Sequence, residues 1–146
     1  MKWKRKLFNQ CVSPAMLYGA ETWVLTKAAE HKLASAQRRM ERRMIGVRLL
    51  DKKSNAWLRG VTKIKDVIAS AAERKWAYGC ELARLTDVKW SQKLTEWRPP
   101  SKRSVGCPKT RWRDDFQKLL ETCNWQCTAR VMTKREWIDL LRCRIL

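Results

Sequence analysis

Apolar residues recur at steps of three and four along most of this chain, which is the spacing of helices with one buried face. The clearest series consists of Ala29, Leu33, Ala36, Met40, Met44 and Val47. Thr26 before it is a candidate N-cap, and Gly46 is a candidate C-terminal stop. The pattern therefore predicts a helix that begins after Thr26, ends at Gly46 and buries the apolar series.

The same spacing predicts helices on both sides of this one. They run from Trp3 to Val12, Pro14 to Trp23, Ser54 to Gly60, Lys63 to Leu85, Arg111 to Leu120 and Trp125 to Leu141. The helix from Lys63 is expected to bury Ile64, Val67, Ile68, Ala71, Ala72, Trp76, Gly79 and Leu82. Clusters of alternating β-branched residues are absent, so we expect an all-α fold, a small bundle of about five to six helices with a C-terminal helical pair.

The segment from Arg98 to Gly106 has a different character. It contains Pro99 and Pro100, which lack a backbone N–H and fix φ, so it cannot continue a helix. We expect a basic, Pro-containing linker or arm over residues 98–110. It would separate a helical region, residues 1–97, from a C-terminal helical tail, residues 111–146.

The charge of the chain indicates what kind of partner it binds. The chain has 33 Lys and Arg against 14 Asp and Glu, a net charge of +19. Such an excess attracts polyanions, so the backbone of RNA or DNA is the expected partner. A basic surface that serves only solubility, or a ribosomal-type structural protein, is the alternative.

Two clusters could bind phosphate. The first is an acid-free run with six basic residues and a threonine, Arg98, Lys102, Arg103, Lys109, Thr110, Arg111 and Arg113. An extended arm of this kind can replace the counterions of a nucleic acid, and a helix start supplies free N–H groups. The second cluster is Arg38, Arg39, Arg42 and Arg43, which share one helical surface. The alternatives are a solvated linker and an ordinary solvated helix face.

Nine tryptophans raise the question of base stacking. Trp57, Trp76, Trp112 and Trp137 lie at helical spacing on apolar faces and are better explained as core residues. Trp97, beside the Pro-rich arm, and Trp3, among lysines, are the two candidates for stacking.

Catalytic chemistry has weak support in the sequence. Asp114 and Asp115 are adjacent at a helix start and would point about 100° apart, so they converge poorly on a metal ion. His31 is the one histidine, and the six cysteines form no CxxC pair. We therefore expect no catalytic residue, no metal site and no cofactor, with the thiols reduced.

No stretch of the chain is apolar enough over sufficient length to cross a bilayer. A secretory signal is not evident either, because polar residues interrupt the apolar run after the basic N-terminus. We expect no membrane association and an intracellular location, nuclear or cytoplasmic.

Four strings in a fixed order carry a resemblance to a known family. They are Leu17–Trp23 (LYGAETW), Met40–Val47 (MERRMIGV), Trp76–Arg84 (WAYGCELAR) and Gly106–Asp115 (GCPKTRWRDD). From about Lys4 to Trp137, this order resembles the region after the polymerase palm in reverse transcriptases of non-LTR (LINE-type) retrotransposons. The resemblance implies a thumb and C-terminal tail that grips the template–primer duplex and depends on a palm for synthesis.

The chain also departs from the family's pattern. Cys107 stands where the family's Gly-Arg-Pro string has Arg, and Cys80 stands where His is usual after the glycine. Thr128–Val131 replaces an Ala-Gln-Asp-Arg-like string. These departures suggest a degenerate genomic copy.

The sequence therefore predicts a reverse-transcriptase fragment that lacks the catalytic palm and endonuclease and binds nucleic acid without sequence preference. Such a chain would not be an enzyme by itself, and the missing palm would be a second partner. A stand-alone, domesticated basic nucleic-acid-binding module is the first alternative. A non-functional degenerate relic is the second.

Overall fold

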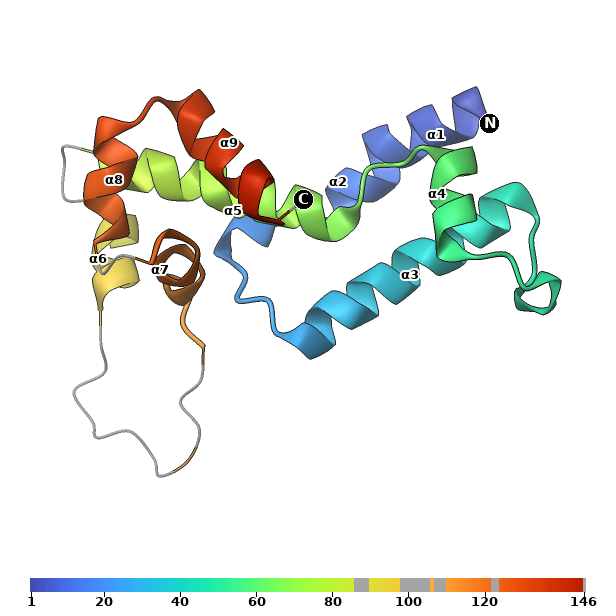
Figure 1. Cartoon of the computed structure of the whole chain (residues 1–146), viewed down its shortest axis with the longest axis horizontal. Helices are drawn as coiled ribbons and strands as arrows, with labels where there is room; N and C mark the ends of the chain where they lie inside the picture. Colours follow the sequence, from blue (N-terminus) through green and yellow to red (C-terminus); the bar gives the residue numbers. More distant parts are fainter. Residues whose placement is uncertain (86–89, 98–105, 107–109, 122–123, 146) are drawn as a thin grey trace. The chain divides into compact units, whose positions relative to one another are not determined.

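The computed structural model describes residues 1–85, 90–97, 106, 110–121 and 124–145. These residues form helices and contain no strand, so the described part of the chain is all-α (Figure 1). The α-helices are α1 (Lys2–Leu7), α2 (Ser13–Met16), α3 (Lys27–Ile45), α4 (Asn55–Thr62), α5 (Val67–Arg84), α6 (Trp90–Glu96), α7 (Asp114–Leu120), α8 (Trp125–Val131) and α9 (Lys134–Ile145). A π-helical turn covers Phe8–Val12, and short 3-10 turns cover Ala20–Thr22 and Leu49–Asp51.

The chain folds into two compact units. The N-terminal unit contains Met1–Ala20 and Leu25–Ala72, and the C-terminal unit contains Glu21–Val24 and Glu73–Leu146. Helix α5 contributes its first residues to one unit and the rest to the other. The expected boundaries at 97 and 110 stay predictions, because residues 98–105 and 107–109 lie outside the described part.

The signals at both ends of α3 and at the start of α4 are confirmed, while α4 runs to Thr62, two residues beyond the predicted end at Gly60. The Thr26 hydroxyl accepts a hydrogen bond from the Ala29 amide at 3.3 Å, and Gly46 ends α3 with φ +81°. A left-handed residue at this place favours glycine, which has no Cβ to clash. The Ser54 hydroxyl caps α4 by accepting from the Trp57 amide at 3.2 Å.

The predicted buried face of α3 is wrong in detail. The apolar series from Ala29 to Val47 is only partly buried, and Ala36 is exposed. The most buried α3 side chains are polar, Gln37 at 2% and Glu41 at 1% exposure. These two residues meet polar groups at the end of α4 and the start of α5, which an apolar side chain could not satisfy.

Gln37 links α3 to the start of α5 with both ends of its amide. Its Nε2 donates to the Lys65 carbonyl at 3.1 Å, and its Oε1 accepts from the Val67 amide at 2.8 Å. The Val67 N–H is one of the helix-start donors that have no partner within the helix. Gln37 therefore supplies a non-local cap that fixes where α5 begins.

Two helix boundaries differ from the predicted ones, the start of α5 and the end of α2, and each difference has a local cause. The long helix begins at Val67 rather than Lys63, because Lys63 is left-handed (φ +50°) and Asp66 caps α5 by accepting from the Ile68 amide at 2.9 Å. The predicted helix from Pro14 to Trp23 is wrong, since α2 ends at Met16. Helical backbone instead runs through Pro14 because the wide π turn before it relieves the clash with the preceding turn.

The last predicted helix, Trp125 to Leu141, is two helices. Met132 is extended (ψ 151°), and α9 starts afresh with Thr133 and Glu136 as a reciprocal cap. The Thr133 amide donates to Glu136 Oε2 at 2.8 Å, while the Glu136 amide donates to the Thr133 hydroxyl at 3.3 Å. The Thr-x-x-Glu pattern is a sequence signal for a helix start. The continuous helical spacing of apolar residues from Trp125 to Leu141 concealed it.

The role of Gln37 generates a stability prediction. Gln37→Met keeps the approximate length of the side chain but leaves the Val67 N–H without its partner. We expect the free energy of unfolding to fall by about 1–3 kcal/mol, the cost of an unsatisfied buried polar group. Urea denaturation followed by circular dichroism measures this, with the exposed Gln10→Met as the matched control. Equal stability of both variants would contradict the capping role.

Candidate nucleic-acid interface

A stack of aromatic rings forms the core of the C-terminal unit. The Trp76 and Trp137 rings stack with centroids 4.7 Å apart, and Phe116 stacks on Trp76 at 4.6 Å. Trp76 Nε1 donates to the Trp137 carbonyl at 2.5 Å, and Trp137 Nε1 donates to the Trp76 carbonyl at 2.9 Å. This exchange satisfies two buried indole N–H groups and joins α5 to α9.

Gly79 allows α7 to reach this stack. A Cβ at Gly79 would lie 2.7 Å from Cζ of Phe116 and 2.8 Å from its Cε1, which is closer than real contacts permit. The Phe116 ring therefore occupies the space that any other side chain would fill. The glycine of the string WAYGCEL is explained by this contact.

Lys75 is a buried cation whose ammonium group lies against the rings of Trp112 and Phe116. Its ammonium group donates to Asp115 and, at 3.1 Å, to the Trp23 carbonyl, and it lies 5.4 Å from the Trp112 ring centroid. Burial lowers the pKa of Lys75 below its ordinary value, and the hydrogen bond and charge of Asp115 oppose this change. Asp115 therefore serves as the counter-ion of a buried lysine.

Trp112 and Asp114 also have structural partners. Trp112 Nε1 donates to the Glu21 carbonyl at 2.7 Å, and its ring meets Tyr78 edge to face at 6.2 Å. Asp114 accepts from the Arg111 amide at 2.7 Å at the start of α7. Residues 21–23, 76–79 and 111–115, which belong to three of the strings recognised in the sequence, thus meet in one place together with Lys75 and Phe116.

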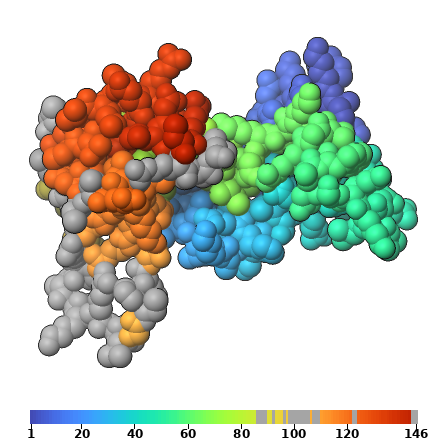
Figure 2. Space-filling model, in the orientation of Figure 1, coloured from blue at the N-terminus to red at the C-terminus, as the bar shows by residue number. Residues whose placement is uncertain are grey.

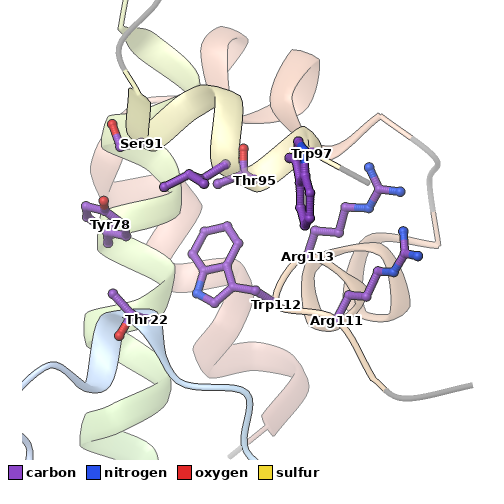
Figure 3. Close-up of a pocket in the computed structure, with 9 residues that line it drawn as sticks. Thr22, Tyr78, Ser91, Thr95, Trp97, Arg111, Trp112 and Arg113 are labelled. Carbon is purple, nitrogen blue, oxygen red and sulfur yellow. The ribbon is translucent and has the colours of Figure 1, made fainter. Parts of the chain in front are cut away.

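A pocket of about 470 Å³ lies beside this junction (Figure 3). Its lining residues are Thr22, Tyr78, Ser91, Leu94, Thr95, Trp97, Arg111, Trp112 and Arg113. Figure 3 shows the guanidinium groups of Arg111 and Arg113 on the same side of the pocket, with the Trp97 ring near them. The pocket combines aromatic walls with a cationic edge.

The first predicted phosphate cluster is described only at its C-terminal end. Arg111 and Arg113 line the pocket, and Thr110 is exposed beside them. The other predicted members, Arg98, Lys102, Arg103 and Lys109, lie outside the described residues. Trp97, a stacking candidate from the sequence, also lines the pocket. The remaining lining residues were not singled out as site residues, since they come from separate segments and share no local pattern.

The four arginines of α3 divide into two pairs. Arg38 is turned inward, with 18% of its side chain exposed and Nη2 3.9 Å from Asp66. Arg42 donates from Nη2 to the Lys53 carbonyl and to Asn55 Oδ1, each at 3.1 Å. Arg39 and Arg43 are exposed. The exposed part of this predicted cluster is therefore the Arg39 and Arg43 pair.

The tryptophan predictions had mixed outcomes. Trp76 and Trp137 are buried as expected, Trp112 is half-buried, and Trp57 is 41% exposed, so its assignment to the core is wrong. Trp57 follows the Ser54 cap in the first turn of α4, where one face of a short helix remains uncovered. Trp97, a stacking candidate, is 64% exposed.

The described residues contain neither a membrane-spanning helix nor a cluster of metal ligands. No helix there is long and apolar enough to cross a bilayer, and no three potential metal ligands are grouped. Four cysteines fall in this part of the chain, and each is a free thiol: Cys11, Cys80, Cys127 and Cys143. Cys107 and Cys123 lie outside it.

The Gly79 contact predicts opposite effects for two glycine substitutions. Gly79→Ala should destabilise the protein by about 1–3 kcal/mol, because the new methyl group would displace the buried Phe116 ring. Gly60→Ala is the matched control, since it lies in α4 with no atom within 4 Å of a new Cβ. That control should stabilise by about 0.5–1 kcal/mol. Thermal unfolding of both variants measures the effects, and a Gly79→Ala protein as stable as the parent would contradict the contact.

Burial of Cys80 predicts unequal thiol reactivity. Cys80 is fully buried, and this burial raises the pKa of its thiol. The buried thiol is shielded from the reagent and its raised pKa disfavours the reactive thiolate, so at pH 8 Cys80 should react more slowly with iodoacetamide than the exposed Cys11, Cys127 and Cys143. Peptide mass spectrometry over time measures each rate. Addition of urea should remove the difference, and equal rates in the folded protein would refute the burial.

Comparison with known proteins gives an informative similarity. The chain is 29% identical over 149 residues to F52C9.6 of Caenorhabditis elegans, a protein whose name describes it as transposon-derived. The match covers 93% of this chain and 53% of that protein, so the chain spans about half the length of its curated relative. No family model and no solved structure matches the chain. The similarity is consistent with a transposon origin.

Proposed function

We propose that this chain is the thumb and C-terminal tail of a non-LTR retrotransposon reverse transcriptase. In this role it binds the backbone of template–primer RNA or DNA without sequence preference and has no catalytic activity of its own. The observation that carries the proposal is the +19 charge together with the acid-free basic run that ends at Arg113. The transposon-derived relative supports the origin.

The packing of the C-terminal unit supports the resemblance to this family. Trp23, Gly79 and Trp112 come from three strings that lie far apart in the sequence, and all three take part in one junction around Lys75 and Phe116. Residues with such a role are needed for the fold whether or not the polymerase is intact. The strings that carry the resemblance therefore have a role in packing. In our proposal the palm, and not this chain, carries out catalysis.

Exposed apolar residues favour a fragment over a stand-alone module. In the N-terminal unit Trp3, Leu7, Tyr18, Leu49 and Leu50 are each more than half exposed. Figure 2 shows surface contributed by α1 in dark blue and by residues near 50 in green. Large exposed apolar groups mark interaction sites in many proteins, and the palm region is the partner we propose for them.

Salt dependence tests the phosphate contacts. Replacement of Lys102, Arg103, Lys109 and Arg111 by Ala should weaken binding to all duplex sequences alike. If the four residues make about four phosphate contacts, the log–log salt slope on B-DNA should become shallower by about 3.6. Fluorescence anisotropy across a salt series measures this slope.

A control with the same loss of charge separates contact from general attraction. Lys2, Lys27, Lys32 and Lys65 are exposed in the N-terminal unit, and their replacement by Ala also removes four charges. This control should leave the slope nearly unchanged. If the arm variant retains the parental slope, the arm is a linker, and the Arg39 and Arg43 pair is the next candidate.

A further inference from the structure

The residue before the acid-free run and the last arginines of that run line the same pocket. Trp97 is the last described residue before the run, Arg111 and Arg113 are close to its end, and all three line the pocket. Four more basic residues, Arg98, Lys102, Arg103 and Lys109, lie between them in the sequence. A strand whose phosphates contact Arg111 and Arg113 is therefore held next to the pocket.

The walls of the pocket can accept a flat aromatic group. Trp112 is held in place by its hydrogen bond to Glu21 and its contact with Tyr78, and it forms one wall. Trp97 and Leu94 are 64% and 67% exposed, although both are large apolar side chains that usually gain from burial. Exposed tryptophan next to a basic segment is typical of surfaces that stack nucleic-acid bases.

The polar groups of the pocket select an anion. None of the nine described residues that line it is acidic, and the two arginines lie on one side (Figure 3). A guanidinium group has five N–H donors and binds phosphate oxygens in pairs, even when it also has a protein partner. The hydroxyl groups of Ser91 and Thr95 add hydrogen-bonding capacity for the edge of a base. A volume of about 470 Å³ is within the usual range for sites that bind small groups.

We propose that this pocket binds an unpaired base of an RNA or DNA strand, which stacks on Trp97 while Arg111 and Arg113 contact the adjacent phosphates. The inference rests on the proposed function, because the basic run holds the strand that carries the base. A base inside a duplex is already stacked and paired, and it would have to leave the helix to enter. The pocket therefore adds a preference for single-stranded segments to the non-specific attraction of the arm.

Substitution of Trp97 tests the stacking contact. Trp97→Ala should weaken binding to a short single-stranded oligonucleotide by about tenfold, the effect expected from losing one stacked base. Binding to a blunt duplex and both salt slopes should stay the same, because no phosphate contact is lost. Trp97→Phe should retain most of the affinity for the single strand. Fluorescence anisotropy measures each affinity, and circular dichroism verifies the fold of each variant.

Trp90→Ala is the matched control. Trp90 is the first residue of α6, and Trp97 directly follows the end of that helix. Trp90 is 78% exposed but does not line the pocket, so its loss should change neither affinity. The same oligonucleotide with abasic sites gives a second control. It should bind the parent about as weakly as the intact oligonucleotide binds Trp97→Ala, and the substitution should then have no further effect.

The outcomes separate this inference from the proposed function. If Trp97→Ala weakens single strand and duplex equally, or changes neither, the pocket does not bind a base. Salt-dependent binding by the parent chain would still support the proposed function in that case. If the parent binds neither nucleic acid, the proposed function fails, and the inference fails with it.

Discussion

The close approach of the Phe116 ring to Gly79 is the contact on which the C-terminal unit depends. It places Phe116 against the backbone of α5, where the ring also stacks on Trp76 at 4.6 Å and on Trp125 at 4.7 Å. Helices α5, α7 and α8 are thereby joined through one fully buried side chain. Because Trp112 and Arg113 immediately precede α7, the same contact places two residues of the pocket wall.

The buried charge of Lys75 imposes a second constraint on the same unit. A buried ammonium group needs several partners, and here the Asp115 carboxylate, the Trp23 carbonyl and the face of Trp112 supply them. The requirement joins a short segment near residue 23 to a helix that starts at Asp114. Two adjacent acids that could suggest metal chemistry thus have a role in packing and capping. The pocket beside them has a cationic edge and aromatic walls.

The N-terminal unit is organised by polar contacts at helix ends. Gln37, Glu41 and Arg42 reach from α3 to the ends of α4 and α5 and the segment before α4. These contacts explain why the apolar series of α3 remains half-exposed. The Arg42 hydrogen bonds and the ion pair between Arg38 and Asp66 explain why two of its four arginines are unavailable as a free patch. Such contacts join residues up to 30 positions apart, so a single-sequence pattern cannot show them.

Local signals alone determined the all-α class, the caps at Thr26 and Ser54 and the end of α3 at Gly46, since each acts within one helical turn. The buried face of α5 was also readable, because Trp76, Gly79 and Leu82 repeat at helical spacing. Only the tertiary structure decided that Arg38 and Arg42 turn inward and that Trp57 remains exposed. It also decided that Trp97, Arg111 and Trp112 share a pocket. The physical reason is that helix propensity and capping depend on residues that are neighbours in the sequence, whereas a pocket depends on which helix faces meet. Here the missing Cβ at Gly79 allows α7 to pack against α5.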